Sequence, residues 1–271
     1  MEHQELIQLK KAACKIRMGV IEATHGAKSG HPGGSLSAAE LFAYLYNKEM
    51  NINPQDPQWE DRDRFVLSKG HTAPGLYAAL ANRGYFPVED LPTLRHADSY
   101  LQGHPNMNVV PGVDMSTGSL GQGVSVAAGM AKAAKYLGKT SQRFYALLGD
   151  GELEEGECWE AFLFSAHYKL DNYCVIIDLN GLQIDGSTHE VMNTDPVDAK
   201  LRDFGFNVVS IVGMTLNRWS GRLMLSTIVS NRPLPSLCAR PKAKGSALWK
   251  IRSAGTAKLP TTRNTTLLCR S

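Results

Sequence analysis

The distribution of apolar and polar residues predicts alternating strands and helices along most of the chain. Residues 144–148 and 173–177 are short, nearly continuous apolar runs, typical of strands buried on both faces of a parallel sheet. Residues 64–68 and 208–211 predict two further strands, and residues 6–21 an amphipathic first helix. Other helices are predicted over residues 38–46, 71–80, 123–136 and 159–166. We expect an α/β fold with a parallel sheet flanked by helices.

Composition narrows the class of protein. A chain of 271 residues with 43% hydrophobic content can form one large domain or two small ones. It has no run of 18 apolar residues, so no membrane-spanning helix is expected, and residues 1–5 lack the pattern of a signal peptide. Five cysteines without paired spacing indicate the reducing cytoplasm and argue against a disulfide framework or a zinc site.

The net charge of +3 conceals a sharp division. Residues 213–271 contain 11 of the 29 Lys and Arg residues and none of the 26 Asp and Glu residues. Residues 1–212 hold all the others, which gives that part a net charge of −8 and the tail a net charge of +11. We therefore predict an α/β domain over residues 1–212 and a basic, poorly ordered tail over residues 213–271.

Two polar groups follow the two central predicted strands. Asp150 lies between Gly149 and Gly151, and Asn180 follows the next strand thirty residues later. Both are expected at the carboxyl edge of the sheet, where ligands bind, and their oxygens suit Mg²⁺ or Ca²⁺. The glycines let a ligand approach the backbone, and the next helix start can bind an anion. These residues predict a metal-bridged diphosphate; alternatively, Asp150 caps a helix and Asn180 makes a turn.

Three histidines lie beside glycines at predicted ligand-side turns. His31 is in a Gly- and Pro-rich loop, before a helix that Ser35 or Ser37 could cap; His71 follows the first strand; His104 is in the irregular segment 84–118. A long irregular segment inside a compact domain is usually functional. An imidazole at such a turn can donate to a phosphate or a hydroxyl, although a locally bonded turn histidine is the alternative.

Together these motifs resemble the N-terminal section of transketolases, over about residues 5–212. The motifs in order are residues 29–33, 68–71, 103–105, 118–123, 149–156 and 180–182. The resemblance implies a thiamine-diphosphate-binding domain with Mg²⁺ or Ca²⁺. It implies metal ligation by Asp150, Asn180 and the backbone carbonyl of Leu182.

The same resemblance assigns the remaining site residues. It implies that His31 and His71 contact the cofactor phosphate and the substrate, and that His104 contacts a substrate hydroxyl, so His31 and His104 are the expected catalytic residues. The other cofactor-binding residues that it implies are Gly118, Ser119, Leu120, Gly151, Glu155 and Glu160. Of these, Gly118 to Leu120 would face the thiamine ring. Glu155 and Glu160 would form an acidic pair near a dimer interface, unless Glu160 is an ordinary surface carboxylate.

The implied activity is the transfer of a two-carbon ketol unit between sugar phosphates in pentose phosphate metabolism. In this family a second, pyrimidine-binding domain completes the site, and we expect it on a C-terminal partner subunit, in a homodimer or heterotetramer. The isolated chain is then expected to be inactive. The alternatives are another thiamine enzyme, similar to deoxyxylulose-phosphate synthase or to the alpha subunit of a 2-oxo-acid dehydrogenase, or an inactive remnant with a basic binding tail.

The tail departs from the family pattern after Ile211. Read in a frame shifted by one base, it permits family-like segments, such as Trp-His-Gly-Lys-Ala-Pro from the join of Ala254 and Gly255. We interpret residues 213–271 as an out-of-frame translation after a one-base deletion at codon 212, in the gene or in its sequencing. A genuine basic tail that binds nucleic acid is the alternative, but it has few interleaved aromatic residues.

Overall fold

A five-stranded parallel sheet forms the centre of the part of the chain that the computed structural model describes, residues 3–183, 186–212 and 237–240. The strand order is β1-β2-β3-β7-β6, and each neighbouring pair is parallel. The strands are β1 (Arg64–Leu67), β2 (Phe144–Gly149), β3 (Tyr173–Asp178), β7 (Leu237–Arg240) and β6 (Val209–Val212). The predicted α/β class with a helix-flanked parallel sheet is confirmed.

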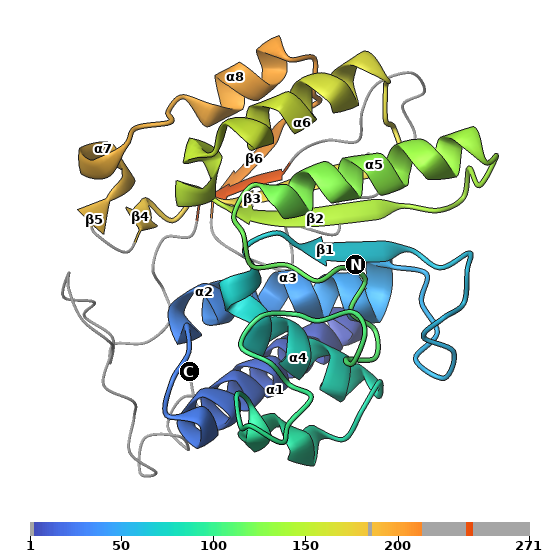
Figure 1. Ribbon diagram of the computed structural model, residues 1–271, viewed down its shortest axis with the longest axis vertical. Helices are drawn as coiled ribbons and strands as arrows, with labels where there is room; N and C mark the ends of the chain where they lie inside the picture. Colours follow the sequence, from blue (N-terminus) through green and yellow to red (C-terminus); the bar gives the residue numbers. More distant parts are fainter. Residues whose placement is uncertain (1–2, 184–185, 213–236, 241–271) are drawn as a thin grey trace.

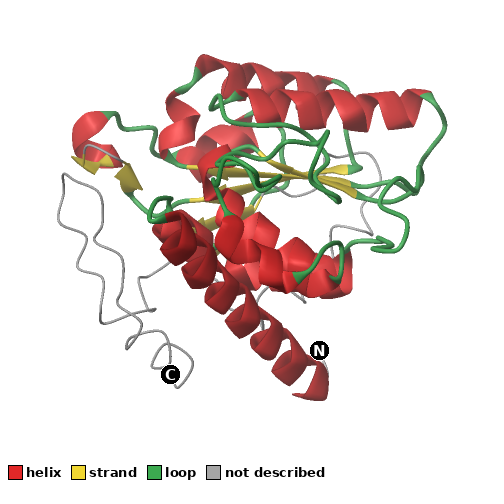
Figure 2. Ribbon diagram, turned by 60° about the horizontal axis from the view of Figure 1, so that its bottom comes forward, coloured by secondary structure: helices red, strands yellow, loops and turns green. Residues whose placement is uncertain are grey.

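Helices cover both faces of the sheet (Figure 1). One face carries α1 (His3–Ala27), α2 (Pro32–Ser37), α3 (Ala39–Tyr44), the π-helix η1 (Leu45–Glu49) and α4 (Ala73–Arg83). The other face carries α5 (Gln122–Tyr136), α6 (Gly156–His167) and α8 (Val197–Asp203). Figure 2 shows the sheet nearly edge-on between these two layers.

Alternation along each strand divides the core into two. Phe65, Tyr145 and Leu147 pack with the layer that contains α1 to α4. Their chain neighbours Val66 and Ala146 pack with α5 and α6 instead. Because successive side chains of a strand point to opposite faces, strands buried on both faces must be apolar throughout, which explains the continuous apolar runs in the sequence.

Short elements lie at the edges of the sheet and in the connections. Three are 3₁₀ turns: η2 (Gly70–Thr72), η3 (Val88–Thr93) and η4 (Gly151–Glu154). After β3, the strands β4 (Leu182–Gln183) and β5 (Gly186–Ser187) form a small antiparallel pair, and α7 (Thr188–Val191) follows. In the described part of the chain no helix is both long and apolar enough to cross a membrane.

The structure corrects four details of the sequence prediction. The helix predicted over residues 38–46 is α3 with the start of η1, and a separate helix, α2, precedes it from Pro32, because proline is favourable in the first turn of a helix. Ser35 and Ser37 therefore lie inside α2 and cap no helix; the Ser35 hydroxyl donates to the His31 carbonyl at 3.1 Å. The turn η4 separates Asp150 from α6. The strand β7 was not predicted, and the rest of the tail lies outside the described residues.

Candidate functional site

Asp150 and the turn at Asn180 lie side by side at the carboxyl edge of the sheet. The pairing of β2 with β3 sets Gly149 opposite Asp178, so the chain leaves both strands at one level. Asp150 Oδ2 accepts the Gly181 N–H at 2.5 Å, and its Oδ1 accepts the Gly151 N–H at 3.0 Å. Gly181 has φ of 75°, in the left-handed region that favours glycine. The Asp150 carboxylate therefore lies against the Asn180 turn, and its bond to the Gly151 N–H at the start of η4 also matches the alternative in which Asp150 caps a helix.

The oxygen atoms in this corner fit a hard divalent cation. Asp150 is 4% exposed, and burial, followed by the nearby Asp178 charge, raises the pKa of its carboxyl. Asn180 and Leu182 are exposed, and Asn180 Oδ1 accepts the Leu182 N–H at 2.8 Å. A carboxylate, an amide oxygen and a carbonyl form an all-oxygen donor set of the kind that Mg²⁺ prefers. Among the described residues no cluster of three or more His, Cys, Asp or Glu side chains could hold a metal instead.

Two of the predicted histidines are in ring contact. The ring centroids of His31 and His71 are 5.2 Å apart, with the planes at 71°. The Ser35 hydroxyl joins their two loops, because its single proton is shared between the His31 carbonyl at 3.1 Å and the Thr72 carbonyl at 3.2 Å. His31 thus comes from the start of α2 and His71 from η2, after β1.

His104 belongs to the same cluster. A Cβ atom added at Gly118 would lie 3.4 Å from the His104 ring, so this histidine lies against the loop before α5. Burial lowers the pKa of His71 to about 4, with smaller contributions from Lys69, His31 and His104. Burial and the Arg95 charge lower the pKa values of His31 and His104. At neutral pH the three imidazoles are therefore neutral, and each can donate one hydrogen bond and accept another.

Arg95 is a residue of this cluster that the sequence analysis missed. It lies in the irregular segment between η3 and α5, where no motif marks it. Its Nη1 donates to the Ser29 hydroxyl at 3.0 Å. A Cβ atom added at Gly103 would lie 2.9 Å from its Nε. Arg95 therefore supplies an exposed positive charge beside His31 and His104.

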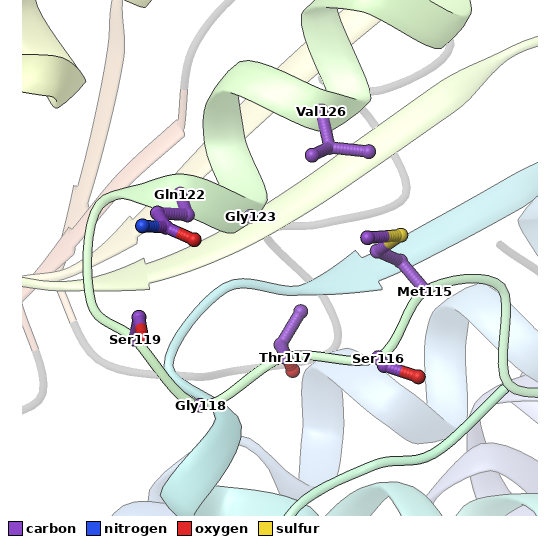
Figure 3. Close-up of a pocket in the computed structure, with 8 residues that line it drawn as sticks. All are labelled: Met115, Ser116, Thr117, Gly118, Ser119, Gln122, Gly123 and Val126. Atoms are coloured by element: carbon purple, nitrogen blue, oxygen red, sulfur yellow. The ribbon is translucent and has the colours of Figure 1, made fainter.

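A cavity of about 320 Å³ adjoins the loop that leads into α5. Figure 3 shows this loop running from Met115 to Ser119 before the helix begins near Gln122. The lining residues are Met115, Ser116, Thr117, Gly118, Ser119, Gln122, Gly123 and Val126. Of the three predicted ring-facing residues, Gly118 and Ser119 line the cavity, whereas Leu120 is 38% exposed and is not in the lining.

The His71 turn packs directly on this loop. A Cβ atom at Gly70 would lie 2.9 Å from the Gly118 nitrogen and from the Thr117 carbonyl carbon. Only a residue without a side chain permits that approach. The close contact brings the histidine cluster and the cavity together at one edge of the sheet.

Glu152 is a second residue that the sequence analysis missed. It is 2% exposed, and its Oε1 accepts the Ser68 hydroxyl at 2.5 Å and the Gly121 N–H at 3.0 Å. Its Oε2 accepts the Gly149 N–H at 3.1 Å. One carboxylate thus connects the ends of β1 and β2 with the loop before α5. The sequence signal was the position of this glutamate directly after Gly151. An acid that is buried at such a turn must find hydrogen-bond donors, such as the hydroxyl and N–H groups found here.

The predicted acidic pair is divided in the structure. Glu155 precedes α6, and a Cβ atom at Gly121 would lie 2.8 Å from the Glu155 Cβ, so Glu155 borders the site. Glu160 is an exposed residue of α6, and its carboxylate makes no hydrogen bond or ion pair with any described residue. Gly151 packs against the β4 segment. A Cβ atom added at Gly151 would lie 3.2 Å from the Gln183 Cβ.

Comparison with known proteins agrees with this geometry. The family model described as transketolase, thiamine diphosphate binding domain, matches residues 8–224, twelve residues beyond the boundary predicted at 212. A 6-deoxy-6-sulfo-D-fructose transketolase subunit, SqwG, of Clostridium sp. (strain MSTE9) is 41% identical over 244 residues, 90% of this chain and 88% of the relative. One subunit of an apulose-4-phosphate transketolase of Actinobacillus succinogenes is 42% identical over 224 residues, 83% of this chain and 79% of the relative.

Single-chain transketolases match over a smaller part of their length. Transketolase of Homo sapiens is 44% identical over 215 residues, 78% of this chain but only 34% of the relative. The structure of transketolase from Leishmania mexicana superimposes with a TM-score of 0.82 at 36% identity, over 86% of this chain and 36% of that one. The chain therefore belongs to the transketolase family and corresponds to its thiamine diphosphate-binding domain.

Proposed function

We propose that this chain is the N-terminal subunit of a split transketolase, and that with a partner it transfers a two-carbon ketol unit between sugar phosphates. The relatives named as transketolase subunits are matched over 88% and 79% of their own lengths. The single-chain human transketolase is matched over about a third, 34%. The bond between Asp150 and the Gly181 N–H carries the proposal, because it joins the two halves of the predicted metal site.

The proposed cofactors are thiamine diphosphate and Mg²⁺, or Ca²⁺ in its place. Asp150, Asn180 and the Leu182 carbonyl would hold the metal, since they provide the oxygen donors that such a cation prefers. When bound, thiamine diphosphate supplies the carbanion-stabilising chemistry, and the protein supplies binding and orientation. Gly151 in η4, Glu155 directly before α6 and the exposed Glu160 within α6 complete the proposed cofactor residues.

The protein side chains in this proposal bind and orient. His31 and His71, as neutral imidazoles, would donate hydrogen bonds to the diphosphate and to substrate, and His104 would contact a substrate hydroxyl. Gly118, Ser119 and Leu120 would lie against the thiamine ring, next to the cavity that the loop lines. The exposed Arg95 charge beside His31 and His104 would favour an anionic, phosphorylated substrate.

We propose that the catalytic assembly is cytoplasmic, is a homodimer or a heterotetramer, and is completed by a partner subunit with the pyrimidine-binding domain. The isolated chain would then bind the cofactor but transfer no ketol unit.

The test of this proposal has two parts. Calorimetry with thiamine diphosphate should show binding with Mg²⁺ and none with EDTA; an absence of binding with Mg²⁺ would refute the cofactor site. Activity should appear only when the partner subunit is added, and a mixture without activity would contradict the subunit proposal.

A second candidate is an inactive remnant, which one observation favours. The tail over residues 213–271 has eleven basic residues and no acidic residue, which suits an out-of-frame translation. Apart from β7 this tail lies outside the described residues. The nucleotide sequence from codon 205 onward tests the reading frame. Tail codons that cannot encode the family-like segments in the shifted frame would exclude an out-of-frame translation.

A further inference from the structure

A buried ion pair lies beneath the proposed site. Lys69 Nζ is 2.8 Å from Asp178 Oδ2, and the two side chains are 3% and 0% exposed. Two charges must lose their hydration to form such a pair, and an apolar pair of the same size is often no less stable. Stability alone is therefore a weak reason for an ion pair in this position.

The pair joins the segments that carry the proposed cofactor residues. Lys69 follows β1 and lies two residues before His71, whereas Asp178 ends β3, two residues before Asn180. The hydroxyl of Ser37, at the end of α2, donates to the same Asp178 Oδ2 at 2.6 Å. Since α2 begins directly after His31, one carboxylate oxygen holds two histidine-bearing segments against the strand that leads to Asn180.

The other oxygen of Asp178 is not satisfied. Oδ1 is buried and has no hydrogen-bond partner within the described structure. Asp63, at the opposite edge of the sheet, is comparably buried at 3% exposure, yet its Oδ2 accepts the Asn51 N–H and its Oδ1 accepts the Arg143 N–H, both at 2.8 Å. A buried acceptor without a donor is costly, so Asp178 differs from an acid that serves folding alone.

We propose that Asp178 is a positioning residue, which through Lys69 and Ser37 sets the spacing of the His31 loop, the His71 turn and the Asn180 turn. The importance of Asp178 for catalysis rests on the proposed function. The spacing of the three segments is a property of the ligand-free chain and can be tested there. Removing the carboxylate should loosen three separate segments together. Removing the Ser37 hydroxyl should loosen only one of them.

Hydrogen exchange of the ligand-free full chain, followed by mass spectrometry, tests this directly. In Asp178→Asn we expect exchange about tenfold faster in peptides covering residues 28–37, 69–72 and 179–183, since charged hydrogen bonds are lost there. Asp63→Asn is the matched control, because it changes an equally buried acid at the other edge. The control should leave those three peptides unchanged relative to the rest of the sheet.

Two further variants keep the test decisive if Asp178→Asn unfolds. Ser37→Ala removes the contacts of this hydroxyl with Asp178 Oδ2 and, within α2, with the Gly34 carbonyl at 2.9 Å. It should increase exchange in residues 28–37 but not in residues 69–72. The double variant K69M/D178N leaves no unpaired buried charge and should be less damaged than the sum of its single variants. Equal acceleration by Asp63→Asn and Asp178→Asn, or no effect of Ser37→Ala on residues 28–37, would overturn the proposal.

Cofactor binding separates this inference from the proposed function. With Mg²⁺ present, Asp178→Asn should weaken thiamine diphosphate binding about tenfold or more, whereas Asp63→Asn should change it less than about twofold. A wild-type chain that does not bind the cofactor would refute the proposed function, and the exchange measurements would still decide the positioning role. A wild-type chain that binds, with Asp178→Asn binding equally well, would overturn the positioning role.

Discussion

The two edges of the sheet use buried charge in different ways. At the amino edge, Asp114 accepts the Phe65 N–H at 2.7 Å and pairs with Arg62 at 2.6 Å and Arg64 at 3.2 Å. Asp63 also has donors on both oxygens. Arginines and backbone N–H groups balance the negative charge of these acids, so they need no additional cation from solution.

The carboxyl edge is unbalanced. Asp150, Glu152 and Asp178 are each at least 96% buried, and in the described structure Lys69 is the one buried lysine or arginine beside them. Burial raises the pKa values of Asp150 and Glu152, as it does that of Asp63 at the amino edge, so the two edges differ in their arginines rather than in burial. A cation bound here would relieve this excess of negative charge. The amino edge is thus a closed edge, where arginines pair with the buried Asp114, whereas the carboxyl edge is an open edge, where three buried acids share one buried lysine.

The largest effect on cofactor binding is expected from substitution of Asp150, an acid at the open edge. Asp150→Ala should reduce Mg²⁺-dependent binding of thiamine diphosphate by about 100-fold or more, because it removes the proposed carboxylate ligand of the metal, and residues that merely support a metal ligand are each worth about 10–100-fold. Calorimetry measures the dissociation constant. Asp63→Ala is the control at the closed edge; it should lower stability and leave the affinity of the folded protein unchanged. Retained affinity in Asp150→Ala would remove the distinction between the edges.

Glu152→Gln should have the next largest effect. The amide cannot accept on both of its polar atoms, so the Gly121 N–H and the Ser68 hydroxyl, or the Gly149 N–H, lose their acceptor. We expect a loss of about 1–3 kcal/mol in the free energy of unfolding. Urea unfolding measures it. Glu154→Gln, at an exposed residue that accepts from Gln183, should change stability little. Equal losses in both variants would contradict the assigned network.

The lowered pKa of His71 predicts that the free energy of unfolding depends on pH. Its pKa is lowered from 6.5 to about 4, so between these values the unfolded chain binds more protons than the folded one. The stability from neutral His71 is complete above pH 6.5 and is lost as the pH falls towards 4, an effect on the order of 2 kcal/mol.

Unfolding curves of His71→Asn between pH 7 and pH 4 check this. The variant should lose less stability on acidification than the wild type. His25→Asn, which changes an exposed histidine at the end of α1, should retain the wild-type slope. A wild-type slope in His71→Asn would show that the histidine cluster is open to water.

The smallest effect is expected from surface charge at the closed edge. Lys139 forms ion pairs with Glu60 at 3.0 Å and Asp61 at 3.1 Å, and both acids are exposed. Exposed pairs gain little in water and are screened by salt. Lys139→Ala should therefore leave the melting temperature unchanged within error, at low and at high salt. A clear decrease would mean that the amino edge depends on more than its buried bonds.

Much of the fold and part of the site could be predicted from the sequence. The four predicted strands appear as β1, β2, β3 and β6, because continuous apolar runs report burial on both faces. Asp150 and Asn180 could be placed together because carboxyl ends of parallel strands share an edge. The roles of the site residues remain predictions for the binding experiments.

The amino-acid sequence by itself determined local features: the spacing of apolar residues, the ends of the strands, the glycine-containing turns and the tail without acidic residues. The tertiary structure alone decided which distant groups meet, such as Lys69 with Asp178, Ser68 with Glu152, and Arg95 with Ser29. It also decided that β7 lies between β3 and β6. The physical reason is that periodicity records the environment of each segment along the chain, whereas pairing between segments far apart in sequence depends on how the layers pack in space.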